Sequence, residues 1–391
     1  MREEAALAER RFEVRAAARG WHRAGAIGED VRAAIEAAYP DDRARLGPVF
    51  RVLVFGFTVL AVNALFGLFG VIMAAALTRS DGIPLLFFGL VLVAATELQL
   101  GPLRRTQGGT ESATAVVGLC YLLGGLLWLV ESAQLGSEAW INLALILVVA
   151  LCGGAAWRWG YVFFAAIAAL AFFPLLARGP GGRVTWVIVP LVLAPVLLRA
   201  SDSARLTPSH RRSCQAVAVV SLVFLYVAVH LGSWDLGLVE ALTGEWHASR
   251  PPPPFRPLFA VATALVPLLT LAWGIVARRR LLINLGLVGV VSALVTLRFY
   301  VHVAPLWVAL LAGGAGALGL ALGLRRYLDS GPAHERHGFT AEPLFADPER
   351  RSALEVAASV ARLSPAARVA ERPGFQGGGG RSGGGGATGE F

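Results

Sequence analysis

The chain has 391 residues, of which 56% are hydrophobic, and its mean hydropathy is +0.62. Soluble domains usually contain about 45–50% apolar residues, so this composition excludes an ordinary soluble protein. The net charge is +9, from 35 basic and 26 acidic residues, and every basic residue is an arginine. The lack of lysine excludes chemistry that needs one, such as a Walker A loop or a Schiff base. Because the arginines flank apolar blocks, their charge indicates orientation in a membrane and no nucleic-acid partner.

The segment 1–47 is charged throughout and contains no short apolar run of the kind found in a cleavable signal peptide. Within it, "EDVRAAIEAAY" at 29–39 has the spacing of a helix with one apolar face. The residues on that face are Val31, Ala34, Ile35, Ala38 and Tyr39. Residues 2–19 also suit a helix, and Gly25 lies in the turn between the two. We therefore predict a cytoplasmic helical hairpin over 1–47, which packs on the membrane helices, pairs with a second copy or binds a partner.

Ten apolar blocks follow the hairpin, with the length needed to cross roughly 30 Å of hydrocarbon at about 1.5 Å per residue. They lie in a transmembrane domain over 48–327, at roughly 50–77, 83–100, 113–131, 139–157, 159–177, 184–199, 213–231, 257–277, 281–299 and 303–324. The sixth block contains Pro190 and Pro195 and is predicted to be a broken helix. The predicted fold class is therefore all-α, a polytopic integral membrane protein with about ten transmembrane helices.

The arginines between the blocks predict the orientation, because cytoplasmic loops carry an excess of positive charge. With the N-terminus placed in the cytoplasm, fifteen arginines fall inside, at Arg43, Arg45, Arg51, Arg104, Arg105, Arg158, Arg199, Arg205, Arg211, Arg212, Arg278, Arg279, Arg280, Arg325 and Arg326. Six fall outside, at Arg79, Arg178, Arg183, Arg250, Arg256 and Arg298. Both termini are therefore predicted to be cytoplasmic. The composition, rich in Arg, Ala and Gly, is typical of a bacterial protein, so the predicted location is the bacterial inner membrane.

Residues 328–391 form the predicted cytoplasmic tail. Its segment 348–363 suits one amphipathic helix, since Asp347 is a suitable N-cap and Pro348 fits the first helical position. Its end, 374–391, is rich in glycine and is predicted to be disordered, because it cannot bury enough apolar area to offset the chain entropy.

The stretch "GWHRAGAIGEDVRAAIEAAY", followed by a basic linker and a train of apolar blocks, resembles the start of a known family. These are predicted bacterial membrane proteins of the domain-of-unknown-function 2157 type, which begin with W-x-x-x-G-x-I-(S/T)-x-x-x-x-x-x-I. The matching residues here are Trp21, Gly25, Ile27 and Ile35. Gly28 stands where the family usually has Ser or Thr, and 125–160 resembles the family's third and fourth spans. The resemblance implies a polytopic helical membrane protein without an established activity, and it carries over no site residue.

The sequence assigns no catalytic, cofactor-binding or metal-ligating residue. The predicted outer face carries polar residues whose spacing matches no metal motif. They are His230, Asp235, Glu240, Glu245, His247 and His302. Ionisable residues of the apolar blocks lie near the predicted membrane interfaces, where a structural role is expected, at Glu97, Glu131 and Arg298. Three deeper amides are predicted to form hydrogen bonds between helices, namely Asn63, Asn142 and Asn284.

Three classes of function remain open at this stage. The first is a structural or signalling membrane protein whose cytoplasmic hairpin binds a protein partner or self-associates. The second is a transporter or flippase-like protein for an apolar or lipid substrate. The third is a membrane enzyme at the outer face, built on His230, His247 and His302. The sequence favours the first class, and it favours a protein without enzymatic activity and without a cofactor, whose constant partner is the lipid bilayer.

Overall fold

The computed structural model divides the chain into two units, 1–312 and 313–391, which are described separately. The structure describes residues 3–23, 25–40, 46–72, 82–103, 105, 108–131, 136–178, 182–235, 255–301, 306–331, 335–336 and 339–340. The predicted tail helix at 348–363, the Gly-rich end and most of the outer loop lie outside these residues. So do four of the six candidate residues of the outer face, namely Glu240, Glu245, His247 and His302.

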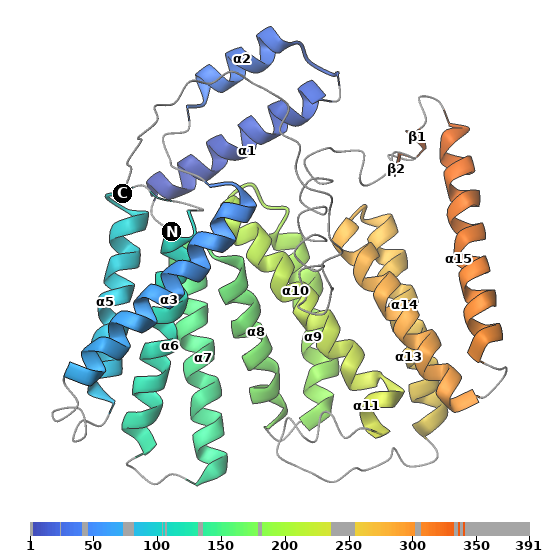
Figure 1. Ribbon diagram of the computed structural model, residues 1–391. Helices are drawn as coiled ribbons and strands as arrows, with labels where there is room; N and C mark the ends of the chain where they lie inside the picture. The colour runs from blue at the N-terminus through green and yellow to red at the C-terminus, as the bar shows by residue number, and fades with distance from the viewer. Residues whose placement is uncertain are drawn as a thin grey trace, which may run out of the picture. The chain divides into compact units, whose positions relative to one another are not determined.

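The described part of the first unit is helical (Figure 1). Its helices are α1 (Glu3–Arg23), α2 (Glu29–Ala38), α3 (Pro48–Ile72), α5 (Ile83–Leu100), α6 (Thr110–Glu131), α7 (Ser137–Trp159), α8 (Val162–Ala177), α9 (Gly182–Ala200), α10 (Pro208–Val229), α11 (Leu231–Asp235), α13 (Arg256–Val276) and α14 (Arg280–Val301). Helix α15 (Leu306–Asp329) begins at the end of this unit and continues into the second. The second unit also contains two antiparallel two-residue strands, β1 (Glu335–Arg336) and β2 (Phe339–Thr340). Apart from that pair, the predicted all-α class is confirmed for the described residues.

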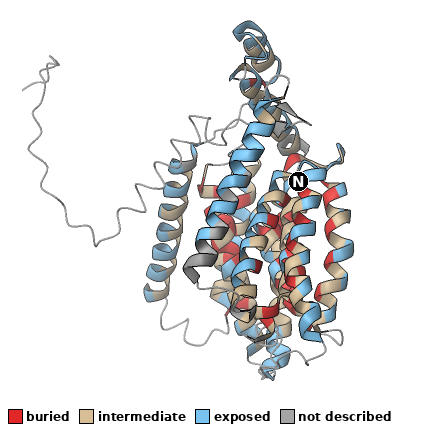
Figure 2. Cartoon of the chain, turned by 90° about the vertical axis from the view of Figure 1, so that its right-hand side faces the viewer, coloured by how far each residue is buried: buried red, intermediate tan, exposed pale blue. Residues whose placement is uncertain are grey.

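Eight of the described helices are long and apolar enough to cross a membrane, namely α3, α5, α6, α7, α9, α10, α13 and α14. Each of the ten predicted blocks coincides with a helix, but α8 has only 16 residues. Many large apolar side chains face outwards; on α3, Phe57 is 69% exposed and Val71 is 76% exposed. Figure 2 shows exposed positions along the outer sides of the helices. A surface of this kind is suited to hydrocarbon, because exposed apolar patches of such extent are rare in soluble monomers.

The prediction that the sixth block is broken is wrong. Helix α9 continues from Gly182 to Ala200 with both Pro190 and Pro195 inside it. Pro190 is fully buried, and the neighbouring Ala194 and Leu198 pack in a cluster with side chains of α10 and α14. Prolines are tolerated in membrane helices whose neighbours compensate for the freed carbonyl groups. The packing around α9 therefore keeps this helix continuous.

Helix α10 is central to the packing of the first unit. Its residues Phe224 and Ala228 pack with α8 and α9, where Trp186 is fully buried and its ring nitrogen donates a hydrogen bond to the carbonyl of Phe173, at 2.5 Å. Leu222 and other residues of α10 pack with α9 and α14. Helix α10 therefore links α8 and α9 to α14.

Glycines allow two helix pairs to approach closely. A Cβ atom at Gly89 of α5 would lie 2.7 Å from the side chain of Leu122 on α6, and one at Gly125 of α6 would lie 2.8 Å from Leu86 on α5. Small residues permit this close contact of backbones in membrane helices. Helices α13 and α14 use the same device at Gly274, Gly286 and Gly289.

Candidate functional site

The two N-terminal helices are joined by charged side chains. Helix α1 contributes Arg15, whose guanidinium lies 3.9 Å from Glu36 of α2, and Arg32 of α2 lies 3.0 Å from the same carboxylate. Arg32 also binds Glu29, and this hydrogen bond holds the pKa of the exposed Glu29 carboxyl below its ordinary value. The turn between the helices passes through Gly25, whose φ of +72° is the left-handed conformation that glycine adopts readily.

Helix α1 binds the beginning of α10 through a second set of charged groups. The carboxylate of Glu13 accepts one hydrogen bond from Arg211, at 3.1 Å, and one from Arg212, at 3.0 Å. One turn earlier on α1, the carboxylate of Glu9 accepts a hydrogen bond from the hydroxyl of Ser209. The hairpin is thus anchored to the bundle of apolar helices through α1, at the N-terminal turn of α10.

The same hairpin keeps apolar side chains exposed. Trp21 is 53% exposed, and Val31 and Tyr39 are each 43% exposed. Helix α2 contains no buried residue, although one of its faces carries the apolar side chains that the sequence predicts. The described contacts of the hairpin therefore include its charged groups and bury Ala8 and Ala18 of α1, and they leave part of its apolar surface uncovered.

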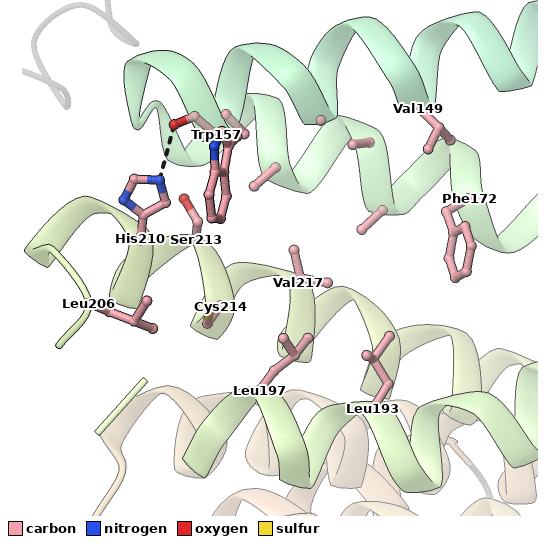
Figure 3. Close-up of a pocket in the computed structure, with 15 residues that line it drawn as sticks. Val149, Trp157, Phe172, Leu193, Leu197, Leu206, His210, Ser213, Cys214 and Val217 are labelled. Atoms are coloured by element: carbon pink, nitrogen blue, oxygen red, sulfur yellow. Dashed lines mark hydrogen bonds between the residues drawn. The ribbon is translucent and has the colours of Figure 1, made fainter. Parts of the chain in front are cut away.

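A cavity of about 380 Å³ lies beside the turn of α10 that binds α1. It is bounded by α7 and α8 on one side and by α9 and α10 on the other (Figure 3). Trp157, His210 and Ser213 lie at one end of it, and Val149 and Phe172 lie at the other. Its volume is within the range of roughly 300–1,000 Å³ that is typical of small-molecule sites.

The lining of the cavity is apolar except at the end beside α1. There, His210 shares a hydrogen bond with the hydroxyl of Thr207, at 2.6 Å, and its other ring nitrogen donates to the carbonyl of Trp157, at 3.1 Å. Ser213 is 8% exposed, and within the described part of the chain its hydroxyl oxygen has no hydrogen-bond partner. The cavity therefore offers a long apolar wall and one unpaired hydroxyl.

The predicted membrane-interface residue Glu97 lies in an ion pair. Its carboxylate accepts hydrogen bonds from Arg158 at 2.8 and 3.0 Å and from the ring nitrogen of Trp159 at 2.9 Å. These contacts tie the end of α5 to the end of α7, which supports a structural role for Glu97. Glu131 is exposed at the end of α6, and Arg298 is partly exposed on α14.

The predicted hydrogen bonds of the deep amides are confirmed at two positions. Asn63 of α3 accepts a hydrogen bond from the hydroxyl of Tyr121 on α6, at 2.9 Å. Asn142 of α7 accepts one from Arg178, which follows the last residue of α8, at 2.5 Å. A bond between helices at Asn284 stays a prediction.

Of the candidate residues at the predicted outer face, the structure describes His230 and the backbone of Asp235, which ends α11. The ring of His230 shares a hydrogen bond with the hydroxyl of Thr296 on α14, at 3.0 Å, and lies edge-on to Tyr226. Among the residues described, no three His, Cys, Asp or Glu side chains are placed to hold a metal ion. His230 therefore has a structural partner, and its grouping with His247 and His302 stays a hypothesis.

Sequence reasoning missed both the α1–α10 contact and the cavity. The α10 residues that line the cavity, His210, Ser213, Cys214 and Val217, have the i, i+3, i+4, i+7 spacing of one helical face. That spacing is a usable signal, but it does not reveal that the neighbouring helices leave space opposite this face.

Comparison of the chain with models of protein families, with curated proteins and with solved structures gave no match. The resemblance to the domain-of-unknown-function 2157 type therefore stays a prediction.

Proposed function

We propose that this chain is a multi-pass protein of the bacterial inner membrane with a structural or signalling role, and that its N-terminal hairpin is the module that binds a cytoplasmic protein. One observation carries the proposal: α1 is anchored to α10 through Glu13, while Trp21 and Val31 stay exposed. A helix pair that merely ordered the start of the chain would be expected to bury its apolar face against the bundle. Here α1 is anchored to α10, whereas α2 contains no buried residue.

The proposed topology has ten spans with both termini in the cytoplasm. Contacts between arginines and their partners support it, because they join residues that the topology places on the same side. On the cytoplasmic side, Arg279 donates a hydrogen bond to the carbonyl of Leu198 at 2.9 Å. On the opposite side, Arg183 donates to Ser233 at 3.1 Å. A cysteine-accessibility scan tests the topology: cysteines at 279 and 183 should be labelled from opposite sides, and labelling from the same side contradicts it.

The partner-binding role is tested with a photo-reactive amino acid at Val31, introduced into the intact protein in its native membrane. Ala33 is the matched control, because it is also exposed and lies about 200° around the same helix. We expect one discrete protein adduct from position 31, reduced by a Trp21→Ala substitution, and none from position 33. Adducts of twice the chain's own mass would assign the surface to self-association. Equal yields from both positions would reject an interaction face on α2.

The apolar cavity favours a second candidate, the transporter or flippase-like protein for an apolar or lipid substrate. A transported substrate must pass from one membrane face to the other, whereas the lining along α10 runs from His210 to Val217. This is about 10 Å at 1.5 Å per residue, roughly a third of the hydrocarbon thickness. The cavity therefore suits binding better than passage, and we rank the structural or signalling role first.

A further inference from the structure

We propose that the cavity between α7, α8, α9 and α10 binds one acyl chain of a membrane phospholipid, whose ester carbonyl accepts a hydrogen bond from Ser213. This proposal goes beyond the structural or signalling role and does not depend on it. Only the assignment to the cytoplasmic leaflet rests on the proposed topology.

The lining selects a hydrocarbon occupant over water. A buried water usually makes about three hydrogen bonds and needs polar partners on several sides. Both ring nitrogens of His210 are already engaged, with Thr207 and with the carbonyl of Trp157. Among the buried side chains of the described lining, this leaves the hydroxyl of Ser213 as the polar group without a partner. One hydroxyl does not hold a column of water, but an apolar chain fills the space without needing more.

Ser213 differs from the other buried serine of the same helix. The hydroxyl of Ser221 donates a hydrogen bond to the carbonyl of Val217 at 2.7 Å, which is the usual way in which a helical serine satisfies itself. Ser213 is almost as deeply buried, yet its oxygen has no such partner among the described residues. Since an unpaired buried hydroxyl is costly, a ligand acceptor at this position removes that cost.

The shape of the cavity agrees with a phospholipid chain entering from one membrane interface. Its polar end lies at the beginning of α10, beside Trp157, whose side chain is 72% exposed (Figure 3). Its apolar end reaches Val149 and Phe172, towards the middle of α7 and α8. An acyl chain with its ester at the interface and its methylenes in the bilayer has the same order of polar and apolar parts.

Two adjacent glycines supply a matched pair of variants. Gly153 lines the cavity and Gly154 does not, and a Cβ atom at either would meet nothing within 4 Å. Gly153→Leu therefore places a side chain in the cavity. Gly154→Leu adds the same side chain one position away, where it is exposed. Both variants carry the same change in helix propensity, so a difference in lipid labelling between them is due to filling of the cavity.

The test uses the full-length protein in phosphatidylethanolamine–phosphatidylglycerol vesicles that contain a phosphatidylglycerol with a diazirine in one acyl chain. After illumination, mass spectrometry locates the label. We expect label on α10 around Cys214 and Val217, reduced about tenfold by Gly153→Leu and unchanged by Gly154→Leu. Label on α3, which is exposed along its length, gives the reference for lipid in general contact. Ser213→Ala should reduce the α10 label about fivefold, as expected for one lost hydrogen bond, whereas Ser221→Ala should not.

Three results would overturn the proposal. The first is label on α3 with none on the lining residues of α10. The second is an equal loss of α10 label in the two glycine variants, which would show that Gly153→Leu acts by disturbing the fold. The third is labelling of α10 by a free fatty acid with the same diazirine but not by the phospholipid, which would reject the phospholipid as the occupant. Because the hairpin is tested by adducts at Val31, failure here leaves the proposed function standing.

Discussion

The contact between α1 and α10 predicts that reversing one charge releases the hairpin. Glu13 accepts a hydrogen bond from each of Arg211 and Arg212, and the side chains involved are 35%, 35% and 49% exposed. Ion pairs this open to solvent contribute about 0.5 kcal/mol each, so losing both costs about 1 kcal/mol. Glu13→Arg also introduces repulsion of similar size, which raises the total to about 2 kcal/mol. The population of released hairpin should then rise about thirtyfold.

The release can be measured as a distance between two spin labels in the reconstituted protein. Suitable sites are the exposed alanines Ala16 on α1 and Ala204 in the loop before α10, after the three native cysteines are replaced. The wild-type background should give one narrow distance, and Glu13→Arg should add a broad, longer component. Adding Arg212→Glu should restore the narrow distance, because one ion pair is re-formed with opposite signs. An unchanged distance in Glu13→Arg would refute the assignment of these charges as the anchor.

Two further predictions concern the stability of the bundle. Gly89→Ala should lower the thermal stability of the purified protein by about 1–3 kcal/mol, because the new methyl group would lie 2.7 Å from Leu122; Gly56→Ala, which meets nothing within 4 Å, should not. Trp186→Ala should cost about 3–5 kcal/mol, since the ring is fully buried, whereas Trp128→Ala, at a residue 56% exposed, should cost less than about 1 kcal/mol. Both are measured by thermal unfolding in one detergent, and equal midpoints within either pair would contradict the packing described.

The positions of the helices could be predicted from the sequence because a helix suited to a bilayer needs one long apolar run. A helix needs about 20 apolar residues to cross the hydrocarbon, and that requirement is visible in one dimension. For Asn63 and Asn142 the sequence predicts that a hydrogen-bond partner exists but does not identify it, because any deep amide needs one. The helix that supplies the partner depends on packing. For Asn63 it is α6, whose Tyr121 lies 58 residues away in the sequence.

The cavity, the hydrogen bonding of the α10 serines and the continuity of α9 depend on which side chains of a neighbouring helix pack against a given residue. Gly153 and Gly154 are adjacent and chemically identical, yet the cavity is beside the first only. Ser213 and Ser221 lie on one helix, but of the two only Ser221 has a hydrogen-bond partner for its hydroxyl among the described residues. Pro190 and Pro195 predict a break when α9 is taken alone, whereas the packing of α10 and α14 against this helix accompanies its continuity. In each case the deciding contact comes from another helix, and no local pattern carries that information.

The first turn of α10 connects the two proposals. Consecutive residues of a helix point about 100° apart, so Arg211 and Arg212 bind α1 while His210, on the same turn, lines the cavity. A ligand that shifts this turn must change the affinity of α1 for it, and by linkage the release of α1 must change the affinity for the ligand by the same factor. Phospholipid labelling of α10 should therefore differ between the wild-type protein and Glu13→Arg. Equal labelling would show that the hairpin and the cavity act independently, even if each proposal is correct by itself.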